Sequence, residues 1–370
     1  MKIVLAFDKF KGSLTASAAC AVVHRALKEK HPAAELVSKP MADGGEGTAA
    51  ALHAALGGEG ITREVTGPLP EMQVTANYLW LAEGRRAFIE MAEASGLVLL
   101  EPEQRNPLLT STRGTGELLA DALQRGAQQI WLTVGGSATV DGGTGAAAAL
   151  GWKFLDAHGR ELRPCGAALG RIKKLVAPAR AWPVIEVLCD VDHPLCGGHG
   201  AARVFGPQKG ATPAMVKQLD AGLRNLANVV RAQLGKDILD VPGAGAAGGL
   251  AAGAIAFFNA RLVPGIATVM HASRLHEVMV GADWVITGEG CFDEQSLRGK
   301  VVAGVAQLAR AHGAKVAVLA GRVRLEEAQW RGAGVHLVRS LAPSTMSTAE
   351  AMARAAELLH AEARLLILSA

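Results

Sequence analysis

Short apolar runs that end directly in polar, glycine-rich loops recur along this chain and limit its fold more than any other feature. Residues 2–7 read KIVLAF and end at Asp8, and the runs at 130–134 and 283–287 end in loops that contain several glycines. Each run has the length of a buried parallel strand. Because ligands of open α/β sheets bind outside the carboxyl ends of the strands, the pattern predicts an α/β fold whose loops form the binding site.

The order of the predicted elements indicates two domains, one inserted into the other. Strands and helices alternate over residues 2–56 and again after residue 282, whereas three strand-like segments joined by turns at 61–91 are typical of an antiparallel meander. We therefore expect a doubly wound, Rossmann-like α/β domain from residues 1–60 and 281–370. A second α/β domain of mixed sheet, residues 61–280, is inserted into it, and we expect the active site in the cleft between the two.

Individual elements follow from apolar periodicity and from the positions of glycine and proline. The expected strands are residues 2–7, 35–39, 61–66, 73–81, 86–91, 130–134, 184–189, 283–287, 315–320 and 335–341. The expected helices are residues 15–30, 46–56, 114–125, 142–150, 213–234, 297–312, 324–331 and 347–367. Two further expectations are a hairpin over residues 152–163 and a glycine loop followed by a buried helix over residues 241–260.

Composition excludes several classes of protein. Of the 370 residues, 50% are apolar and 19% charged, which excludes general disorder. The net charge of +4 is spread without a dense basic run, so no nucleic-acid partner is expected. Five cysteines without a CxxC pair favour a reducing, cytoplasmic location. The first apolar run is too short for a signal peptide, and residues 241–260 hold Pro242 and five glycines, so no membrane segment is expected.

Two loops near the N-terminus carry groups suited to an anionic substrate. Lys11 and Ser13 lie where the first strand passes into a helix, a junction at which a charge, a hydroxyl and helix N–H groups can hold an anion. Asp43 and Glu46 stand among glycines after the second strand, a composition that lets the backbone approach a ligand. The alternatives are an exposed basic turn for the first loop and a turn with capping groups for the second.

Two further loops follow predicted strands in the middle of the chain. Residues 135–143, GGSATVDGG, place four glycines and two hydroxyls before a helix, which is typical of a phosphate-binding loop, with a purely structural glycine loop as the alternative. Asp190 and Asp192 end another strand and can act as a general base or bind Mg²⁺. A zinc site is an alternative whose spacings fit no common zinc module; its ligands would be Cys189, His193, Cys196 and His199.

Carboxylates and a lysine also follow the strand at 283–287. Glu289, Asp293 and Lys300 can together hold a metal–nucleotide complex. The chain has no GxxxxGK[ST] there, which excludes a P-loop enzyme. Residues 243–248 match GxGxxG, but only a short run ending in proline precedes them, and no acidic residue lies between 249 and 276. A nicotinamide-dependent hydroxy-acid dehydrogenase is therefore the weaker alternative.

Taken together, these loops resemble those of the bacterial type I glycerate kinase family nearly from end to end. The matching segments stand in the order and spacing of that family: DKFKGSLTA (8–16), MADGGEGT (41–48), FIEMAEASGL (88–97), TSTRGTGEL (110–118), GGSATVDGG (135–143), CDVDHPL (189–195), FGPQKGA (205–211), PGAGAAGGL (242–250) and ITGEGCFDEQSLRGK (286–300). The resemblance implies phosphorylation of D-glycerate by Mg-ATP, with 2-phosphoglycerate as the product. Three residues depart from the family pattern, since Val140 and His193 stand where Asn is usual and Cys291 where Arg is usual.

Phosphoryl transfer mainly needs positioning and charge neutralisation, and the loops offer groups for both. We assign D-glycerate to Lys11, Ser13, Gly44, Gly45 and Glu46. Asp190 is the preferred general base, with Asp43 as the alternative, and Lys11 is the catalytic cation. The phosphates of ATP are assigned to Gly135, Gly136, Ser137, Ala138, Asp141 and Lys300, and Mg²⁺ to Glu289 and Asp293.

Two rival functions stay open beside the kinase. One is the dehydrogenase, and the other is a non-catalytic protein that binds hydroxy acids. Cys291 permits the second rival, but the carboxylates at 43, 190, 289 and 293 disfavour it because a pure anion binder gains nothing from them. A homo-oligomer is also left open.

Overall fold

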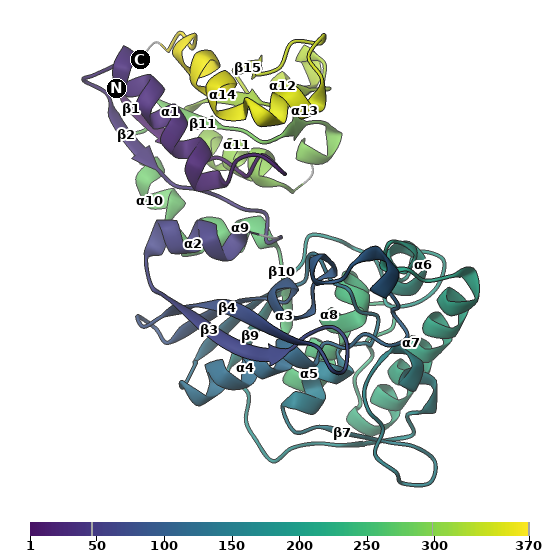
Figure 1. The fold of residues 1–370 in the computed structure, drawn as a ribbon. Helices are drawn as coiled ribbons and strands as arrows, with labels where there is room; N and C mark the ends of the chain where they lie inside the picture. The colour runs from purple at the N-terminus through teal and green to yellow at the C-terminus, as the bar shows by residue number, and fades with distance from the viewer. Residues whose placement is uncertain (46, 298, 369–370) are drawn as a thin grey trace. The chain divides into compact units, whose positions relative to one another are not determined.

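The computed structural model describes residues 1–45, 47–297 and 299–368, and the chain divides into two compact units (Figure 1). Unit 1 comprises Met1–Asp43, Ala50–Gly57 and Pro264–Ala370, and unit 2 comprises Gly44–Ala49 and Gly58–Val263. The boundaries drawn from the sequence lay at residues 60 and 280. The placement of the active site between the two domains stays a prediction.

Unit 1 is built on a five-stranded parallel sheet in the order β15-β13-β11-β1-β2. The strands are β1 (Lys2–Leu5), β2 (Glu35–Ser38), β11 (Trp284–Thr287), β13 (Lys315–Ala320) and β15 (Leu337–Ser340). Strand order reverses between β1 and β11, which makes that position the topological switch point of the sheet, where ligands of such folds bind.

Helices cover both faces of this sheet. On one face, Ile3 and Leu5 pack with α1 (Ala16–Lys30) and α14 (Ala355–Arg364), which lie side by side (Figure 1). The side chain of Val4 points to the opposite face of the sheet and is also buried. Helix α11 (Val301–Ala311) packs against β11 and β13. The doubly wound, Rossmann-like prediction is confirmed.

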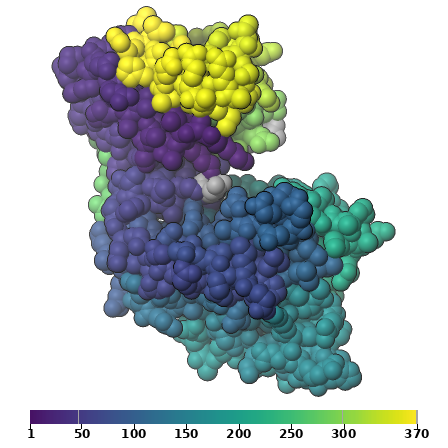
Figure 2. All heavy atoms as spheres, viewed as in Figure 1, coloured from purple at the N-terminus to yellow at the C-terminus, as the bar shows by residue number. Residues whose placement is uncertain are grey.

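The remaining elements of unit 1 are short. The expected helix at 347–367 is divided at Arg354 into α13 (Thr348–Ala353) and α14, whose residues form part of the outer surface of this unit (yellow in Figure 2). The others are α9 (Gly265–Ala272), α10 (Leu275–Met279), α12 (Glu327–Gly332) and the paired strands β12 (Cys291–Phe292) and β14 (Arg322–Val323). Helix α2 (Thr48–Leu56) begins in unit 2 and continues in unit 1.

Unit 2 has a six-stranded sheet in the order β10-β9-β6-β5-β4-β3. Four of its strands are parallel, namely β10 (Arg261–Val263), β9 (Val184–Leu188), β6 (Gln129–Thr133) and β5 (Arg86–Glu90). The other two, β4 (Gln73–Leu81) and β3 (Glu59–Thr66), are antiparallel, which confirms the expected mixed sheet. The register pairs Glu90 with Thr133 and Thr133 with Leu188, so the loops after β5, β6 and β9 leave the same edge.

The described part of unit 2 has four helices that match predicted ones with shifted ends, and two short helices, at residues 92–95 and 201–205, that the sequence did not predict. They are α3 (Ala92–Ser95), α4 (Arg113–Gln124), α5 (Thr144–Ala149), α6 (Ala201–Phe205), α7 (Pro213–Leu234) and α8 (Ala246–Phe258). The hairpin expected at 152–163 is present as a short turn, with an antiparallel bridge between Leu155 and Glu161 and backbone bonds from the Asp156 amide to Arg160 and from the Leu162 amide to Phe154. In addition, β7 (Lys153–Leu155) pairs with β8 (Lys174–Val176), a strand that the sequence did not indicate, and Asp156 binds the turn amides of His158 and Arg160.

The segment 241–260 forms a glycine turn followed by the buried helix α8, as expected. Phe257 of this helix packs against Trp152 and Phe154, with ring centroids 5.0 and 5.5 Å apart. This segment therefore belongs to the core of unit 2. Across residues 1–45, 47–297 and 299–368, no helix combines the length and the apolar character needed to span a bilayer.

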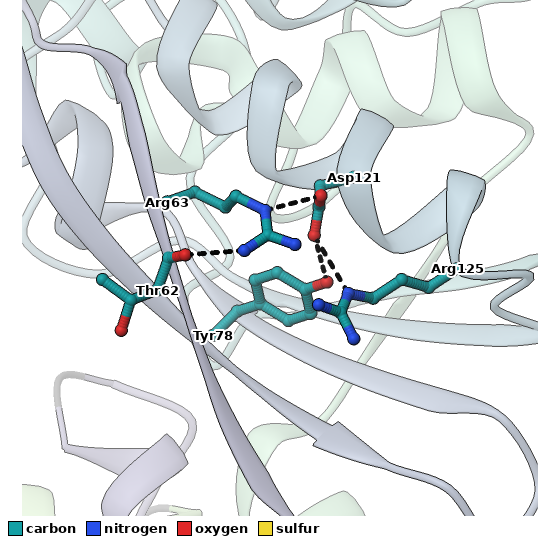
Figure 3. A network of polar contacts seen from close by, with 5 residues as sticks. All are labelled: Thr62, Arg63, Tyr78, Asp121 and Arg125. Carbon is teal, nitrogen blue, oxygen red and sulfur yellow. Dashed lines mark hydrogen bonds and ion pairs between the residues drawn. The ribbon is translucent and has the colours of Figure 1, made fainter.

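A polar network fastens α4 to the antiparallel strands of unit 2 (Figure 3). Asp121 of α4 accepts hydrogen bonds from Arg63 Nε of β3 at 2.7 Å and from the Tyr78 hydroxyl of β4 at 2.5 Å. Arg125, one turn further along α4, donates to the same carboxylate at 3.3 Å. The network joins three elements at the partly exposed surface of the unit.

Candidate active site

Three carboxylates stand at the carboxyl ends of three adjacent parallel strands of unit 1. Asp8 follows β1, Asp43 follows β2 and Glu289 follows β11. The Asp8 amide donates to the Gly288 carbonyl at 3.0 Å, which joins the loops on either side of the switch point. The fold thus gathers at this edge one residue that the sequence proposed as a base, one that it proposed as a metal ligand, and Asp8.

Burial and the repulsion of neighbouring carboxylates raise the pKa values of Asp8 and Glu289. Burial, followed by the neighbouring charge of Asp43, raises the pKa of Asp8 to about 7, although the Lys9 amide bonds its carboxylate. Burial also raises the pKa of Glu289 to about 7, against the opposing effects of Ser296 and Lys300. Among the described residues, the buried Oε1 atom of Glu289 has no hydrogen-bond partner. The raised pKa values show that the surroundings of Asp8 and Glu289 do not fully stabilise their charge, so a cationic ligand would be favoured there.

The other predicted residues of unit 1 are arranged around this edge. Lys300 and Asp293 lie close enough to Glu289 to influence its pKa. Asp293 accepts a hydrogen bond from the Gln295 amide at 2.9 Å and orders the turn before α11. Lys11 and Ser13 are exposed, and the Ser13 hydroxyl donates to the Phe10 carbonyl at 3.0 Å. Their proposed contacts with substrate stay predictions.

The glycine segment that follows Asp43 belongs to unit 2 and lies at the carboxyl end of β5. Glu90, the last residue of β5, accepts a hydrogen bond from the Ala49 amide at 3.2 Å. The Thr48 hydroxyl closes the turn by donating to the Gly45 carbonyl at 2.6 Å. Gly44, with φ of +87°, adopts a backbone conformation that favours glycine. Glu46, predicted to bind substrate, lies outside the described residues.

The loop after β6, residues 134–143, is held on both sides of Ser137; we call it the Ser137 loop. The Leu97 amide donates to the Gly136 carbonyl at 2.7 Å, and the Ala138 amide donates to the Ser95 carbonyl at 2.9 Å. The Ala138 amide is thus committed to the protein. Among the hydrogen bonds of the described chain, none comes from the amides of Gly135, Gly136 and Ser137, and their binding of phosphate stays a prediction.

Asp141 forms the internal anchor of the Ser137 loop. Its fully buried carboxylate accepts four hydrogen bonds, from the Thr112 amide and hydroxyl and from the Gly143 and Gly145 amides, at 2.8–3.1 Å. Burial raises the pKa of Asp141, and these donors oppose that shift. The carboxylate joins the N-terminal ends of α4 and α5, so its ligands are protein groups rather than nucleotide.

A lysine that the sequence reading did not select lies beneath the Ser137 loop. The Lys209 ammonium is buried and donates to Ser137 Oγ at 2.6 Å and to the Thr139 carbonyl at 2.8 Å. Burial lowers the pKa of Lys209 to about 7, while the charge of Asp141 works in the opposite direction. The segment FGPQKGA had been quoted for the family resemblance, but nothing in its spacing relates Lys209 to a serine 72 positions away.

The GxGxxG match at 243–248 supports the Ser137 loop and has no preceding strand. Gly248 has φ of +63°, and its carbonyl accepts a hydrogen bond from the Gly142 amide at 3.1 Å. A Cβ atom at Gly248 would stand 2.0 Å from the Thr139 carbonyl oxygen, so only glycine fits. These glycines serve contact between two loops, which removes the main argument for a dinucleotide site.

Asp190, the preferred base, follows β9 at the same strand edge and is exposed. Nearby, His193 Nδ1 lies 3.1 Å from the His199 carbonyl oxygen. Within the part of the chain that the structure describes, no three His, Cys, Asp or Glu side chains are grouped as a metal cage, which gives the zinc alternative no support. Mg²⁺ in kinases often takes only one or two carboxylates, with phosphates and waters as its other ligands.

Comparison with known proteins places the chain in a family. The sequence model of the Glycerate kinase family matches residues 3–368. The chain belongs to the glycerate kinase family. It is 45% identical to the glycerate kinase of Halalkalibacterium halodurans over 98% of this chain and 96% of that one, and 47% identical to the glycerate 2-kinase of Escherichia coli K12 over 87% and 85%.

The three-dimensional structure is also similar to that of a solved protein of this family. A crystal structure from Salmonella typhimurium LT2, described as a candidate glycerate kinase 2, aligns with a TM-score of 0.89 at 41% identity. The alignment covers 99% of this chain and 96% of that one. The family resemblance drawn from the loop segments is therefore confirmed over the whole chain.

One departure from the family pattern has a local compensation in the structure. Cys291 of β12 pairs in register with Arg322 of β14, and the charges of Arg324 and Arg322 both lower the pKa of the thiol, although burial raises it overall. Two guanidinium groups thus lie beside the position where the family usually has Arg. Val140 is completely buried in the core of unit 2, so its departure concerns packing.

Proposed function

We propose that this protein transfers the γ-phosphoryl group of ATP to a hydroxyl of D-glycerate. The observation that carries the proposal is the carboxylate group Asp8, Asp43 and Glu289 at the switch point of unit 1, with a buried Glu289 oxygen that has no partner among the described residues. Membership of the glycerate kinase family supports the substrate, and the kinase reaction supports ATP as the donor.

The donor atoms of unit 1 fit Mg²⁺. Carboxylate oxygens are the ligands that this cation prefers, and the unpartnered oxygen of Glu289 is one such atom. Glu289 would hold the cation, with Asp293 and the adjacent Asp8 and Asp43 as further oxygen donors. When bound, Mg²⁺ neutralises charge on the phosphates of the nucleotide. The carboxylate oxygens would fix its position at the strand ends.

The Ser137 loop is proposed to bind phosphate through the amides of Gly135, Gly136 and Ser137. Three N–H groups that point to one anion stabilise it best where water is excluded. Lys300, which attracts Glu289, can neutralise further negative charge. Asp141 and Ala138 contribute by fixing the loop, because their polar groups are already bonded to the protein.

On the acceptor side, we propose Lys11, Ser13, Gly44, Gly45 and Glu46 for the carboxylate and hydroxyls of D-glycerate. Asp190 is the proposed base, with Asp43 as the alternative. A base accepts the proton from the attacking hydroxyl and so raises the negative charge on the reacting oxygen. The name of the Escherichia coli relative, glycerate 2-kinase, supports attack by the 2-hydroxyl and hence 2-phosphoglycerate as the product.

A reducing compartment is also proposed. All five cysteines are unpaired in the structure, and Cys20 and Cys196 are buried. Free thiols without disulfides are typical of cytoplasmic proteins. The proposal is therefore a cytoplasmic enzyme that acts on two small anionic molecules.

Phosphorus NMR of the reaction products tests the function most directly. The purified protein is mixed with ATP, Mg²⁺ and D-glycerate, and a new phosphate monoester coupled to the C2 proton is expected together with ADP. A spectrum with no new ester contradicts the kinase proposal. An ester coupled to the C3 protons contradicts only the 2-hydroxyl assignment. Omission of Mg²⁺ with a chelator present is the matched control and is expected to abolish the ester signal.

A further inference from the structure

We propose that Lys209 is a positioning residue that holds the Ser137 hydroxyl as a hydrogen-bond donor toward an anionic oxygen of the ligand. The inference rests on the proposed function for the identity of that ligand, a nucleotide phosphate. It adds a residue from η4 (Pro207–Lys209), a segment far along the chain from the Ser137 loop. It also gives a chemical reason for a buried ammonium group at this place.

The direction of the hydrogen bond fixes what Ser137 can do. In its charged form Lys209 only donates, so at 2.6 Å from Lys209 Nζ the Ser137 oxygen accepts. An anionic ligand beside the loop favours that charged form. The single proton of the hydroxyl is then left for a different acceptor. Backbone hydrogen bonds at Gly136 and Ala138 fix the main chain on both sides of the serine, and the bond from Lys209 holds its side chain.

The position of Lys209 is costly unless its charge is used. Burying a cation carries a large desolvation penalty, and an apolar side chain of similar length would fill the same space without it. Asp141 attracts Lys209, yet its carboxylate is already occupied by four N–H and O–H donors and makes no hydrogen bond to the ammonium. The remaining benefit is a positive charge directly behind a loop that has three amides for an anion.

Lys236 of the same unit offers a matched comparison. Its ammonium donates to the Ile255 and Ala256 carbonyls at 2.9 and 2.8 Å, at the end of α8, and is partly exposed. It too binds backbone oxygens and has a pKa lowered by burial. Unlike Lys209, it holds no hydroxyl. A comparison of variants at the two lysines therefore measures the effect of the contact with Ser137.

The test is a double-mutant cycle with Lys209→Met, Ser137→Ala and the combined variant, with Lys236→Met as control. Affinity for Mg-ATP is measured by calorimetry, and kcat and KM are measured with D-glycerate. Each single variant is expected to weaken Mg-ATP binding by roughly 10- to 100-fold, the size of a hydrogen bond to a charged group. Because both variants remove the same oriented donor, the combined variant is expected to bind no more weakly than Lys209→Met. Lys236→Met is expected to bind like the natural protein.

Losses that add in the combined variant, or a Ser137→Ala protein that binds Mg-ATP normally, overturn the positioning role. Where Lys209→Met does not fold, Ser137→Ala decides alone: a loss of at least 10-fold at an unchanged melting temperature supports the role, and normal binding overturns it. The two proposals can fail separately. If the natural protein makes no ester but Lys209→Met and Ser137→Ala still weaken Mg-ATP binding non-additively, the proposed function is overturned and this inference stands. Absence of any Mg-ATP binding overturns both.

Discussion

Both units place polar residues at the carboxyl ends of parallel strands, but the two edges treat their buried charges in opposite ways. In unit 1, the buried Asp8 and the half-buried Glu289 lie near one another and near Asp43, and their pKa values rise to about 7. In unit 2, the more deeply buried Asp141 receives four hydrogen bonds from the protein. The carboxylates of unit 1 thus receive too few hydrogen bonds to keep their ordinary pKa values. The Asp141 carboxylate of unit 2 has a full set of hydrogen-bond donors.

The difference separates a carboxylate that fixes the protein backbone from carboxylates that we propose to bind a cation. Asp141 fixes the backbone of the Ser137 loop and has no bonding capacity left for a nucleotide. The unit 1 carboxylates repel one another, and the charges of Lys9 and Lys300 offset that repulsion only in part, because the pKa values of Asp8 and Glu289 stay raised. Position at a strand end therefore does not by itself make a residue a ligand-binding one. The number of internal donors decides.

The strongest test of this distinction is Asp141→Asn. The amide NH₂ would face N–H donors of α4 and α5, so buried groups would lose their partners. We expect a loss of about 3–5 kcal/mol in the free energy of unfolding, measured by urea denaturation. Asp121→Asn, in the partly exposed network of Figure 3, is the matched control and is expected to lose much less. Equal losses in the two variants would contradict the structural role of Asp141.

The second prediction concerns the pH dependence of unit 1. The folded pKa of Asp8 is about 7, above the roughly 3.9 of an unfolded aspartate. Its stabilising contribution is therefore complete below pH of about 4 and is lost as the pH rises through about 7. In the absence of Mg²⁺, the free energy of unfolding therefore falls as the pH rises from 4.5 to 8. Asp8→Asn is expected to make this fall smaller by roughly 2–4 kcal/mol, measured by urea denaturation at each pH.

Glu289→Gln is expected to change the same profile in the same direction, because the pKa of Glu289 is raised to about 7 as well. A profile that keeps its full slope in both variants would show that the edge of unit 1 is not short of donors. The comparison with unit 2 would then fail.

The fold could be predicted from the sequence because its signals are local. The run KIVLAF and the helix after it, or the meander at 61–91, depend on neighbours a few positions apart, and both confirmed domain architectures follow from such patterns. The short strands β8 and β10 carried no comparable signal, since each has only three residues. The hairpin at 152–163 is local and could be predicted, whereas the pairing of β7 with β8 on its other side joins residues about 20 positions apart and could not.

The site was harder to predict because its contacts are distant in sequence. Glycines at 142 and 248 read alike in the chain, yet they pack against one another rather than around a ligand. Lys209 meets Ser137 across 72 positions, and Asp141 meets Thr112 across 29. No spacing rule relates such pairs. The sequence indicates which loops matter, and only the fold shows which groups within them are already occupied.

The third prediction asks which edge supplies the general base. Asp190→Asn is expected to lower kcat by roughly 100-fold or more while leaving the melting temperature unchanged, because an exposed carboxylate at a strand end contributes little to stability. Asp43→Asn is the paired variant. A near-normal kcat for Asp190→Asn together with a large loss for Asp43→Asn would transfer the role of base to unit 1. Steady-state kinetics with saturating ATP and D-glycerate measure both.

The smallest expected effect concerns Asp121, whose pKa is shifted in the direction opposite to those of Asp8 and Glu289. Partial burial raises the pKa of Asp121, but hydrogen bonds from Tyr78 and Arg63 and the charges of Arg63 and Arg125 outweigh it, so the pKa is lowered overall. Its contribution to stability is thus present above the unfolded value of about 3.9 and is lost as the pH falls through the folded pKa. Because the network is open to solvent, Asp121→Asn is expected to cost less than about 1 kcal/mol at pH 7. Denaturation at pH 7 and pH 3 measures it, and a cost that grows on acidification would contradict the assigned direction.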